Sequence, residues 1–120
     1  SLHPRATPSA NAAECVANLG GNDAFWKFVD YVFANQDTAL TDVGLSAAAK
    51  QVGVDASSFS SCYSAKKFES IINSDYQGGV AAGVNGTPGN FIVNKKGDVW
   101  LIPGAVPFDT LKATIDAALK

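Results

Sequence analysis

The sequence lacks methionine altogether, has a single histidine, His3, and has two cysteines, Cys15 and Cys62, which lie far apart and form no C-x-x-C pair. It also lacks a His/Cys/carboxylate cluster at metal-ligand spacing, a glycine-rich phosphate loop and a G-x-S-x-G turn. These absences exclude the local signatures of zinc enzymes, P-loop proteins and serine hydrolases. We therefore expect no metal site and no cofactor. Because methionine is missing, we also expect the sequence to be part of a longer translation product.

Basic residues are too few and too dispersed for a nucleic-acid interface. Nine Lys and Arg are set against eleven Asp and Glu, the formal net charge is −2 and the pI is about 5.1. A nucleic-acid or anionic-membrane surface needs clustered Lys and Arg, so we expect neither partner. No apolar run approaches the ~20 residues of a transmembrane helix. With 47% hydrophobic and 17% charged residues, the composition is that of one globular domain.

Hydrophobic periodicity predicts that residues 1–83 are helical. Thr7 and Pro8 read as an N-cap and a first helical residue before an alanine-rich helix over 9–18. A second helix follows the Gly20-Gly21 pair, and residues 35–44 are expected to be a loop. A helix over 45–52 and a short turn to residue 63 precede a longer helix that begins after Ser64 and ends at Gly83. The second helix carries an apolar face made of Phe25, Phe28, Val29, Val32 and Phe33.

Residues 84–120 have a different character. A turn cluster over 85–89 is followed by two short strands over 90–93 and 98–102, joined by a hairpin loop, and then by a helix that Pro107 opens. Both strands carry apolar side chains on both faces, and a two-stranded hairpin is marginal alone. We therefore expect a sheet that is covered on both sides and wider than these two strands.

The residues alone leave the role of the cysteines open. Cys15 and Cys62 could form a structural disulfide, remain buried thiols in a reduced compartment, or act as a redox pair. A catalytic pair of either cysteine with His3 lacks any context for an activated thiolate. The Gly86-Thr87-Pro88 segment is equally open, because most X–Pro bonds are trans and a proline at a strand start is ordinary.

Several segments together resemble the DsbA-like thioredoxin-fold oxidoreductases. Residues 83–93 are similar to a G-V-x-G-T-P-x-x-F-I/V-x signature, and residues 104–108 to a G-A-x-P-[FY] ending. Upstream, residues 3–6, 12–15 and 25–26 are similar to the family's H-P-x-A, A-A-x-[AC] and F-W segments. The order and spacing of these pieces carry the resemblance over nearly the whole chain.

The resemblance implies an α/β (α+β) fold class. It is a partial thioredoxin-like fold in which a helical insertion of about four helices (1–83) precedes a β-hairpin and C-terminal helix (84–120). It implies a cis Thr87–Pro88 bond, and a client-docking loop formed by Gly86, Thr87 and Pro88. Cys15 and Cys62 match a second cysteine pair that bridges two helices of the insertion in part of the family. The family's reactive CxxC would lie upstream of Ser1, so we expect no catalytic residue in this chain and no activity of the chain alone.

The function implied by the resemblance is a part in a thiol–disulfide oxidoreductase that acts on protein cysteines. Its partners would be client proteins with cysteines and a redox partner protein, in the periplasm or another extracytoplasmic or secreted location. A non-catalytic thioredoxin-fold peptide-binding module is the alternative. A relative of the glutathione-dependent isomerases fits less well, because of Thr87 and the extra cysteine pair. We also expect an exposed sheet edge that supports a homodimer.

Overall fold

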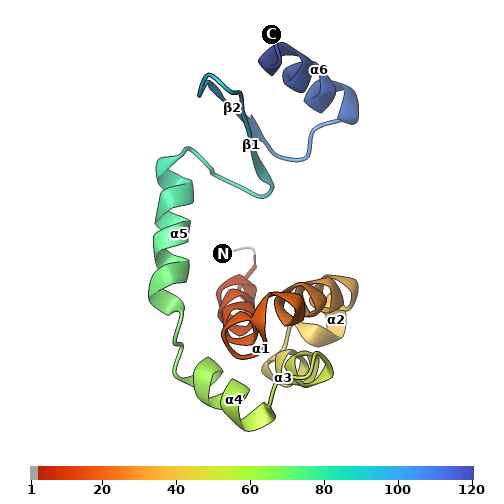
Figure 1. Ribbon diagram of the computed structural model, residues 1–120, viewed down its shortest axis with the longest axis vertical. Coiled ribbons are helices and arrows are strands. Elements are labelled where there is room, and N and C mark those ends of the chain that lie inside the picture. The colour runs from red at the N-terminus through yellow and green to blue at the C-terminus, as the bar shows by residue number, and fades with distance from the viewer. Residues whose placement is uncertain (1–2) are drawn as a thin grey trace. The chain divides into compact units, whose positions relative to one another are not determined.

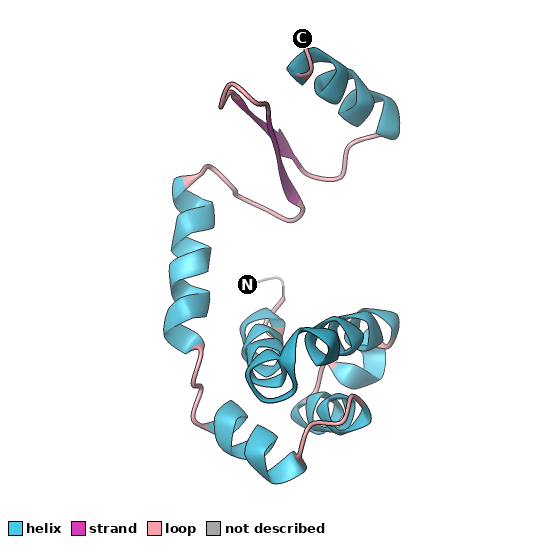
Figure 2. Cartoon of the chain, in the orientation of Figure 1, coloured by secondary structure: helices cyan, strands magenta, loops and turns pink. Residues whose placement is uncertain are grey.

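The structure is a computed structural model that describes residues 3–120. It comprises α1 (Ala6–Ala34), α2 (Gln36–Ala39), α3 (Asp42–Gln51), α4 (Ala56–Ser64), α5 (Glu69–Ala81), β1 (Gly89–Val93), β2 (Val99–Pro103) and α6 (Phe108–Ala118) (Figure 1). Helices therefore precede a β-hairpin and a final helix, as Figure 2 shows by colour. This confirms the expected α+β class, with five helical elements rather than about four before the hairpin.

The chain divides into two compact units, one that extends to Ser74 and one that comprises Asp75–Lys120. The first unit contains α1 to α4 and the start of α5. The second contains the remainder of α5, the hairpin and α6. The domain boundary expected between residues 83 and 84 was placed where the pattern changes from helices to strands. That domain division stays a prediction.

The first unit has a well-formed apolar core. Its largest fully buried side chains are Phe28, Phe59, Leu45 and Val16, which come from α1, α3 and α4. Helix α1 reaches this core with two segments, because its backbone leaves the helical conformation at Gly21, where φ is 80°. Glycine adopts this positive φ without the steric cost that a Cβ would impose. The Gly20-Gly21 pair thus bends the helix as the sequence suggested.

The start of α1 differs from expectation. The helix begins at Ala6, its N-cap is Arg5, and no side chain caps it. Thr7 is therefore not the N-cap, and Pro8 lies within the first helical turn rather than at its first position. Proline is tolerated there because the first-turn N–H groups have no intrahelical acceptor in any case.

The loop expected over 35–44 is largely helical. The single turn α2 occupies Gln36–Ala39, and α3 begins at Asp42, because the Thr41 side chain accepts a hydrogen bond of 2.9 Å from the N–H of Gly44. Threonine is a good N-cap residue, so the signal for this helix start was present in the sequence. The close approach of Gly44 to the backbone of Thr38 and Ala39 leaves no space for a Cβ.

The long helix predicted to begin after Ser64 begins later, at Glu69. Residues 65–68 form turns, in which Lys66 adopts a positive φ of 49°. A non-glycine residue in this conformation interrupts a right-handed helix. The segment 65–68 is consequently a connection between α4 and α5, and its anchoring is described below.

The hairpin in the second unit is antiparallel, and Phe91 pairs with Leu101 and Val93 with Val99. Helix α6 packs against β1, and on one face of the sheet Ile92 and Trp100 are half-buried and Ile102 is buried. The opposite face is exposed along its whole length: its side chains are Phe91, Val93, Val99 and Leu101. The sheet expected to be covered on both sides is thus covered on one side within residues 3–120.

Candidate functional site

Residues 82–88 connect the end of α5 to the start of β1, and all of them except the half-buried Val84 are exposed. Gly83 ends the helical turn at a φ of 87°, and the Val84 side chain packs where a Cβ on Gly89 would otherwise stand. The next four residues, 85–88, are all exposed to solvent. The Thr87–Pro88 peptide bond is cis. The three residues predicted to dock clients, Gly86, Thr87 and Pro88, therefore lie together at the surface.

Two sets of hydrogen bonds fix this loop to the hairpin. The backbone N–H of Gly104 donates to the carbonyl oxygen of Pro88 at 2.8 Å. The Asn90 side-chain amide donates to the carbonyl oxygens of Ile102 and Gly104, each at 3.3 Å. The Asn90 side chain therefore ties the start of β1 to the end of β2. The sequence reading missed Asn90, although a polar residue inside an otherwise apolar strand was the available signal.

Thr87 itself retains unused hydrogen-bonding capacity. Within residues 3–120, neither its backbone N–H, its carbonyl oxygen nor its hydroxyl has an intrachain partner. A Cβ built on Gly86 meets no atom within 4 Å, so the space before Thr87 is open. An extended peptide that approached here would find one donor and one acceptor on the backbone, with no side chain in the way.

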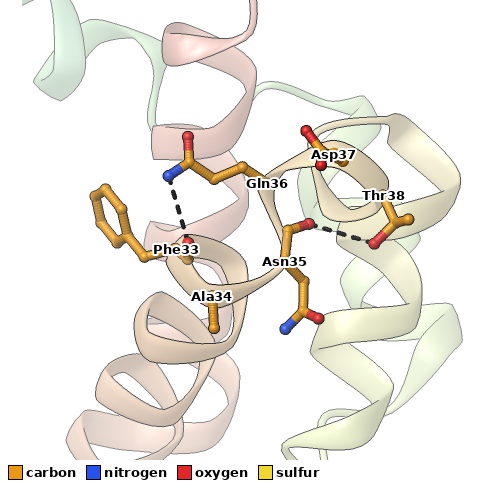
Figure 3. Close-up of a pocket in the computed structure, with 6 residues that line it drawn as sticks. All are labelled: Phe33, Ala34, Asn35, Gln36, Asp37 and Thr38. Atoms are coloured by element: carbon orange, nitrogen blue, oxygen red, sulfur yellow. Dashed lines mark hydrogen bonds between the residues drawn. The ribbon is translucent and has the colours of Figure 1, made fainter.

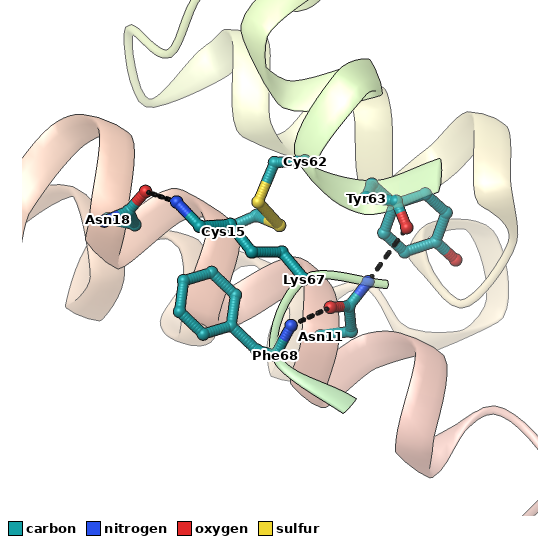
Figure 4. The surroundings of a disulfide bond; sticks show 7 residues. All are labelled: Asn11, Cys15, Asn18, Cys62, Tyr63, Lys67 and Phe68. Atoms are coloured by element: carbon teal, nitrogen blue, oxygen red, sulfur yellow. Dashed lines mark hydrogen bonds between the residues drawn. A yellow bond between two sulfur atoms is a disulfide. The ribbon is translucent and has the colours of Figure 1, made fainter. Parts of the chain in front are cut away.

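In the first unit, Cys15 and Cys62 form a disulfide bond with a Cα–Cα distance of 5.9 Å (Figure 4). Cys15 is fully buried and Cys62 is 8% exposed. The bridge joins α1 to α4, two helices of the helical block, as the resemblance implied. It excludes one of the three alternatives that the sequence left open, two buried free thiols, because the described residues contain no free cysteine.

The disulfide is the middle of three contacts along one face of α1. Asn11 and Asn18 lie one helical turn on either side of Cys15, so all three point in a common direction. The Asn11 amide donates to the carbonyl oxygen of Tyr63 at 3.0 Å and accepts from the N–H of Phe68 at 3.3 Å. The Lys67 ammonium donates to Asn18 at 2.9 Å. Together these contacts hold the connection 65–68 against α1 (Figure 4).

A polar cluster lies near the N-terminus of α1. The guanidinium of Arg5 and the hydroxyl of Tyr63 both donate to the same carboxylate oxygen of Asp42. The Arg5 hydrogen bond, with that of Tyr63, lowers the pKa of Asp42. Burial first, and the neighbouring Asp42 carboxylate second, raise the pKa of Tyr63. The cluster joins α1, α3 and α4 through ionised and hydrogen-bonded groups, and we assign it a structural role.

An open pocket of about 470 Å³ lies where α1 ends (Figure 3). One continuous segment lines it: Phe33, Ala34, Asn35, Gln36, Asp37 and Thr38. Two of its side chains bond within the segment, since the Gln36 amide donates to the Phe33 carbonyl oxygen and the Thr38 hydroxyl to that of Asn35. The Asn35 side-chain amide donates to the carbonyl oxygen of Tyr31 in α1. A ligand site usually draws polar groups from several elements, so we assign no ligand to this pocket.

Among residues 3–120, no three His, Cys, Asp or Glu side chains gather as metal ligands would. No helix in that range has both the length and the apolar character needed to cross a bilayer.

Comparison with known proteins addresses the family directly. Searches of curated proteins and of solved structures found no match. A family model described as the DSBA-like thioredoxin domain matches residues 4–116, which is most of the chain and includes both the disulfide and the proline loop. The chain belongs to the family of DSBA-like thioredoxin domains.

Proposed function

We propose that this chain is part of a thiol–disulfide oxidoreductase that acts on protein cysteines, and that its role is to dock the client polypeptide. The exposed loop Gly86-Thr87-Pro88 supports this most directly, because the Thr87 backbone groups have no partner among residues 3–120 while the loop itself is fixed through Pro88. A fixed loop with free backbone groups can pair with an extended segment at a low ordering cost.

In this proposal, neither cysteine of the chain takes part in thiol–disulfide exchange. Thiol–disulfide exchange requires an accessible thiolate that attacks a disulfide sulfur. Cys15 and Cys62 are joined to each other and buried, so this proposal gives them a structural role. The attacking thiolate is assigned to no residue of this sequence. The chain contributes recognition of the client rather than the exchange step.

A second candidate is a peptide-binding module without redox chemistry. It is favoured by the same observation, that both cysteines of the sequence are occupied in one buried bridge. Both candidates require the loop to bind an extended peptide, and they differ in whether exchange takes place on the bound peptide.

Binding and exchange can be measured on the chain itself. We expect a fluorescent, unfolded peptide with one cysteine and its serine counterpart to bind with equal affinity in an anisotropy titration, because only the backbone is recognised. We also expect no catalysis of insulin reduction. A mixed disulfide between the peptide and Cys15 or Cys62, or clear turnover of insulin, would contradict the structural role of the bridge. Absence of binding for both peptides would overturn the docking proposal.

The compartment and partners belong to the same proposal. A disulfide that closes a long loop persists in oxidising surroundings and is rare in the reducing cytosol, so we place the protein in the periplasm or another extracytoplasmic location. Its partners would then be client proteins with cysteines and a redox partner protein. Secretion can be tested by fractionating cells that express the gene and by alkylating free thiols in each fraction. Recovery of the chain only in the cytosol with two reactive thiols would contradict this placement.

A further inference from the structure

The chain contains eight asparagines, and only Asn85 is followed directly by a glycine. The residues that follow the other seven are Ala, Leu, Asp, Gln, Ser, Phe and Lys. This difference bears on a reaction in which the backbone nitrogen of the next residue attacks the side-chain amide of an asparagine. A Cβ on that next residue crowds the nitrogen and restricts the backbone around it, whereas glycine does neither.

Asn85 and Gly86 lie in the loop that leads to β1. Both residues are exposed, and neither belongs to a helix or a strand. Within residues 3–120, the N–H of Gly86 has no acceptor and the Asn85 side chain makes no hydrogen bond. A Cβ built on Gly86 meets no atom within 4 Å. The attacking nitrogen and the amide that it would attack are therefore engaged with nothing else in the described chain.

The fold restrains the other asparagines. Five of them lie in regular structure, which fixes φ and ψ and so prevents the next nitrogen from rotating toward the side-chain amide: Asn11, Asn18 and Asn22 in α1, Asn73 in α5 and Asn90 in β1. The remaining two have hydrogen-bonded side chains. The Asn35 amide donates to the carbonyl oxygen of Tyr31, and the Asn94 side chain accepts from the N–H of Asp98.

We propose that Asn85 is a self-modification site, at which the chain converts its own asparagine into aspartate and isoaspartate without an enzyme. The nitrogen of Gly86 bonds to Cγ of Asn85, and the Cγ–Nδ2 bond breaks. Ammonia leaves with the proton that the Gly86 nitrogen loses, and a five-membered succinimide ring remains. Water then opens the ring at one of its two carbonyl carbons. No oxidation or reduction takes place, and the overall change is from amide and water to carboxylate and ammonium.

The two products differ in the path of the main chain. Water attack at Cγ restores the ordinary main chain, with an aspartate at position 85. Water attack at the main-chain carbonyl makes the chain continue through Cβ and Cγ, which adds one methylene group before Gly86. Either product adds one negative charge to a chain whose formal net charge is −2, and places that charge two residues before Thr87.

The effect on peptide binding rests on the proposed docking function, whereas the modification itself does not. Pro88 stays fixed by the N–H of Gly104, so a longer main chain before Gly86 displaces the backbone groups of Thr87. We expect chains with isoaspartate at position 85 to bind an unfolded peptide about tenfold more weakly. Asn85→Asp carries the charge without the extra methylene group and should weaken binding less.

The modification can be followed by peptide mapping with mass spectrometry after the folded chain is incubated in mildly alkaline buffer. Asn85 should convert before the other asparagines, and faster as pH rises, because hydroxide removes the Gly86 proton. Gly86→Ala should slow the conversion by about tenfold or more. Asn73, exposed in α5 and followed by Ser74, is the internal control. Conversion of Asn85 no faster than that of Asn73, or an unchanged rate in Gly86→Ala, overturns the proposal.

Hydroxylamine gives a second readout, because it attacks a succinimide carbonyl and cuts the chain there. The folded chain should yield the fragments 1–85 and 86–120. Cleavage that occurs only after unfolding would show that the fold prevents ring closure, and would overturn the proposal. If Gly86→Ala does not fold, the comparison of Asn85 with Asn73 in the unmodified chain still decides. Complete conversion with unchanged peptide binding would contradict the docking function and leave the modification established.

Discussion

Gly104 donates a backbone hydrogen bond to Pro88, so that the residue after β2 holds the residue before β1. The consequence is that the proposed docking loop is fixed at its C-terminal end, whereas the backbone groups of Thr87 have no partner in the part of the chain that the structure describes. Asn90 reinforces the same point through its two side-chain contacts. An exposed loop with a fixed end is suited to recognition, because little conformational freedom is lost when a partner binds.

The disulfide should account for a large part of the stability of the helical unit. Closing a loop of this length contributes about 4 kcal/mol in the chain-entropy description. Reduction, or the double variant C15S/C62S, should lower the free energy of unfolding by that amount in a urea titration. A titration of the denatured, unreduced chain should find no free thiol. Two free thiols would show that the bridge does not form.

Gly89 should tolerate no side chain, because its Cβ would lie 2.8 Å from a methyl carbon of Val84. We expect Gly89→Ala to reduce the free energy of unfolding by about 1–3 kcal/mol. Removing the obstacle with Val84→Ala should recover part of that loss in the double variant. The control is Gly86→Ala, whose Cβ meets nothing within 4 Å. If Gly89→Ala and Gly86→Ala are equally stable, the packing described for this loop is wrong.

Asn11 should be the most important polar side chain of the helical unit. It is 5% exposed and satisfies both the carbonyl oxygen of Tyr63 and the N–H of Phe68. Asn11→Ala leaves these buried groups unpaired, which should cost about 1–3 kcal/mol and speed exchange of the Phe68 amide. Asn18→Ala is the matched variant on the same helix face, and its exposed contact with Lys67 should matter little. Similar effects of both substitutions would contradict this assignment.

The polar cluster gives the stability a defined pH dependence. The pKa of Asp42 is lower when folded, so its contribution is present above its ordinary value of 3.8 and is lost as pH falls through the folded pKa. The pKa of Tyr63 is higher when folded, so its contribution is present below 10.0 and is lost as pH rises through the folded pKa.

The variant Asp42→Asn distinguishes the loss of stability at low pH, which depends on Asp42, from the loss at high pH, which depends on Tyr63. The acid limb of a stability–pH curve should flatten, and Tyr63 should ionise at lower pH in an absorbance titration because it loses the carboxylate neighbour. Tyr63→Phe identifies which tyrosine signal is involved. An unchanged tyrosine titration in Asp42→Asn would mean that the hydrogen bond between the two side chains is absent in solution.

Much of this architecture could be read from local signals. The change from helical periodicity to short apolar strands placed the hairpin. Asp55 and Ser57 are both residue types that cap helices, and the structure uses Asp55, whose side chain accepts from the N–H of Ser58 at the start of α4. The N-cap residue Thr41 is an equally local signal for the start of α3, but that helix start was not predicted. By contrast, the late start of α5 depends on Lys66 adopting a positive φ, which the local preference of a lysine does not predict.

The site was only partly accessible to the same reasoning. Pro88 and its neighbours were identified through the family resemblance, because a Thr-Pro pair before a strand is ordinary by itself. Asn11 and Asn90 were missed, since their partners are main-chain groups more than ten residues away in sequence. Such hydrogen bonds depend on which segments of the folded chain lie side by side, and the amino-acid sequence near each asparagine does not predict this.

Peptide docking by the proline loop is tested most directly by mapping amide chemical shifts during titration with an unfolded, cysteine-containing peptide. We expect the largest changes at Gly86, Thr87 and Gly89, with the surroundings of Cys15 and of the pocket at Asn35 unaffected. Gly86→Val should abolish the changes while Gly78→Ala, in open space on α5, preserves them. Shifts confined to the helical unit, or unchanged spectra at saturating peptide, would contradict the docking role of Gly86, Thr87 and Pro88.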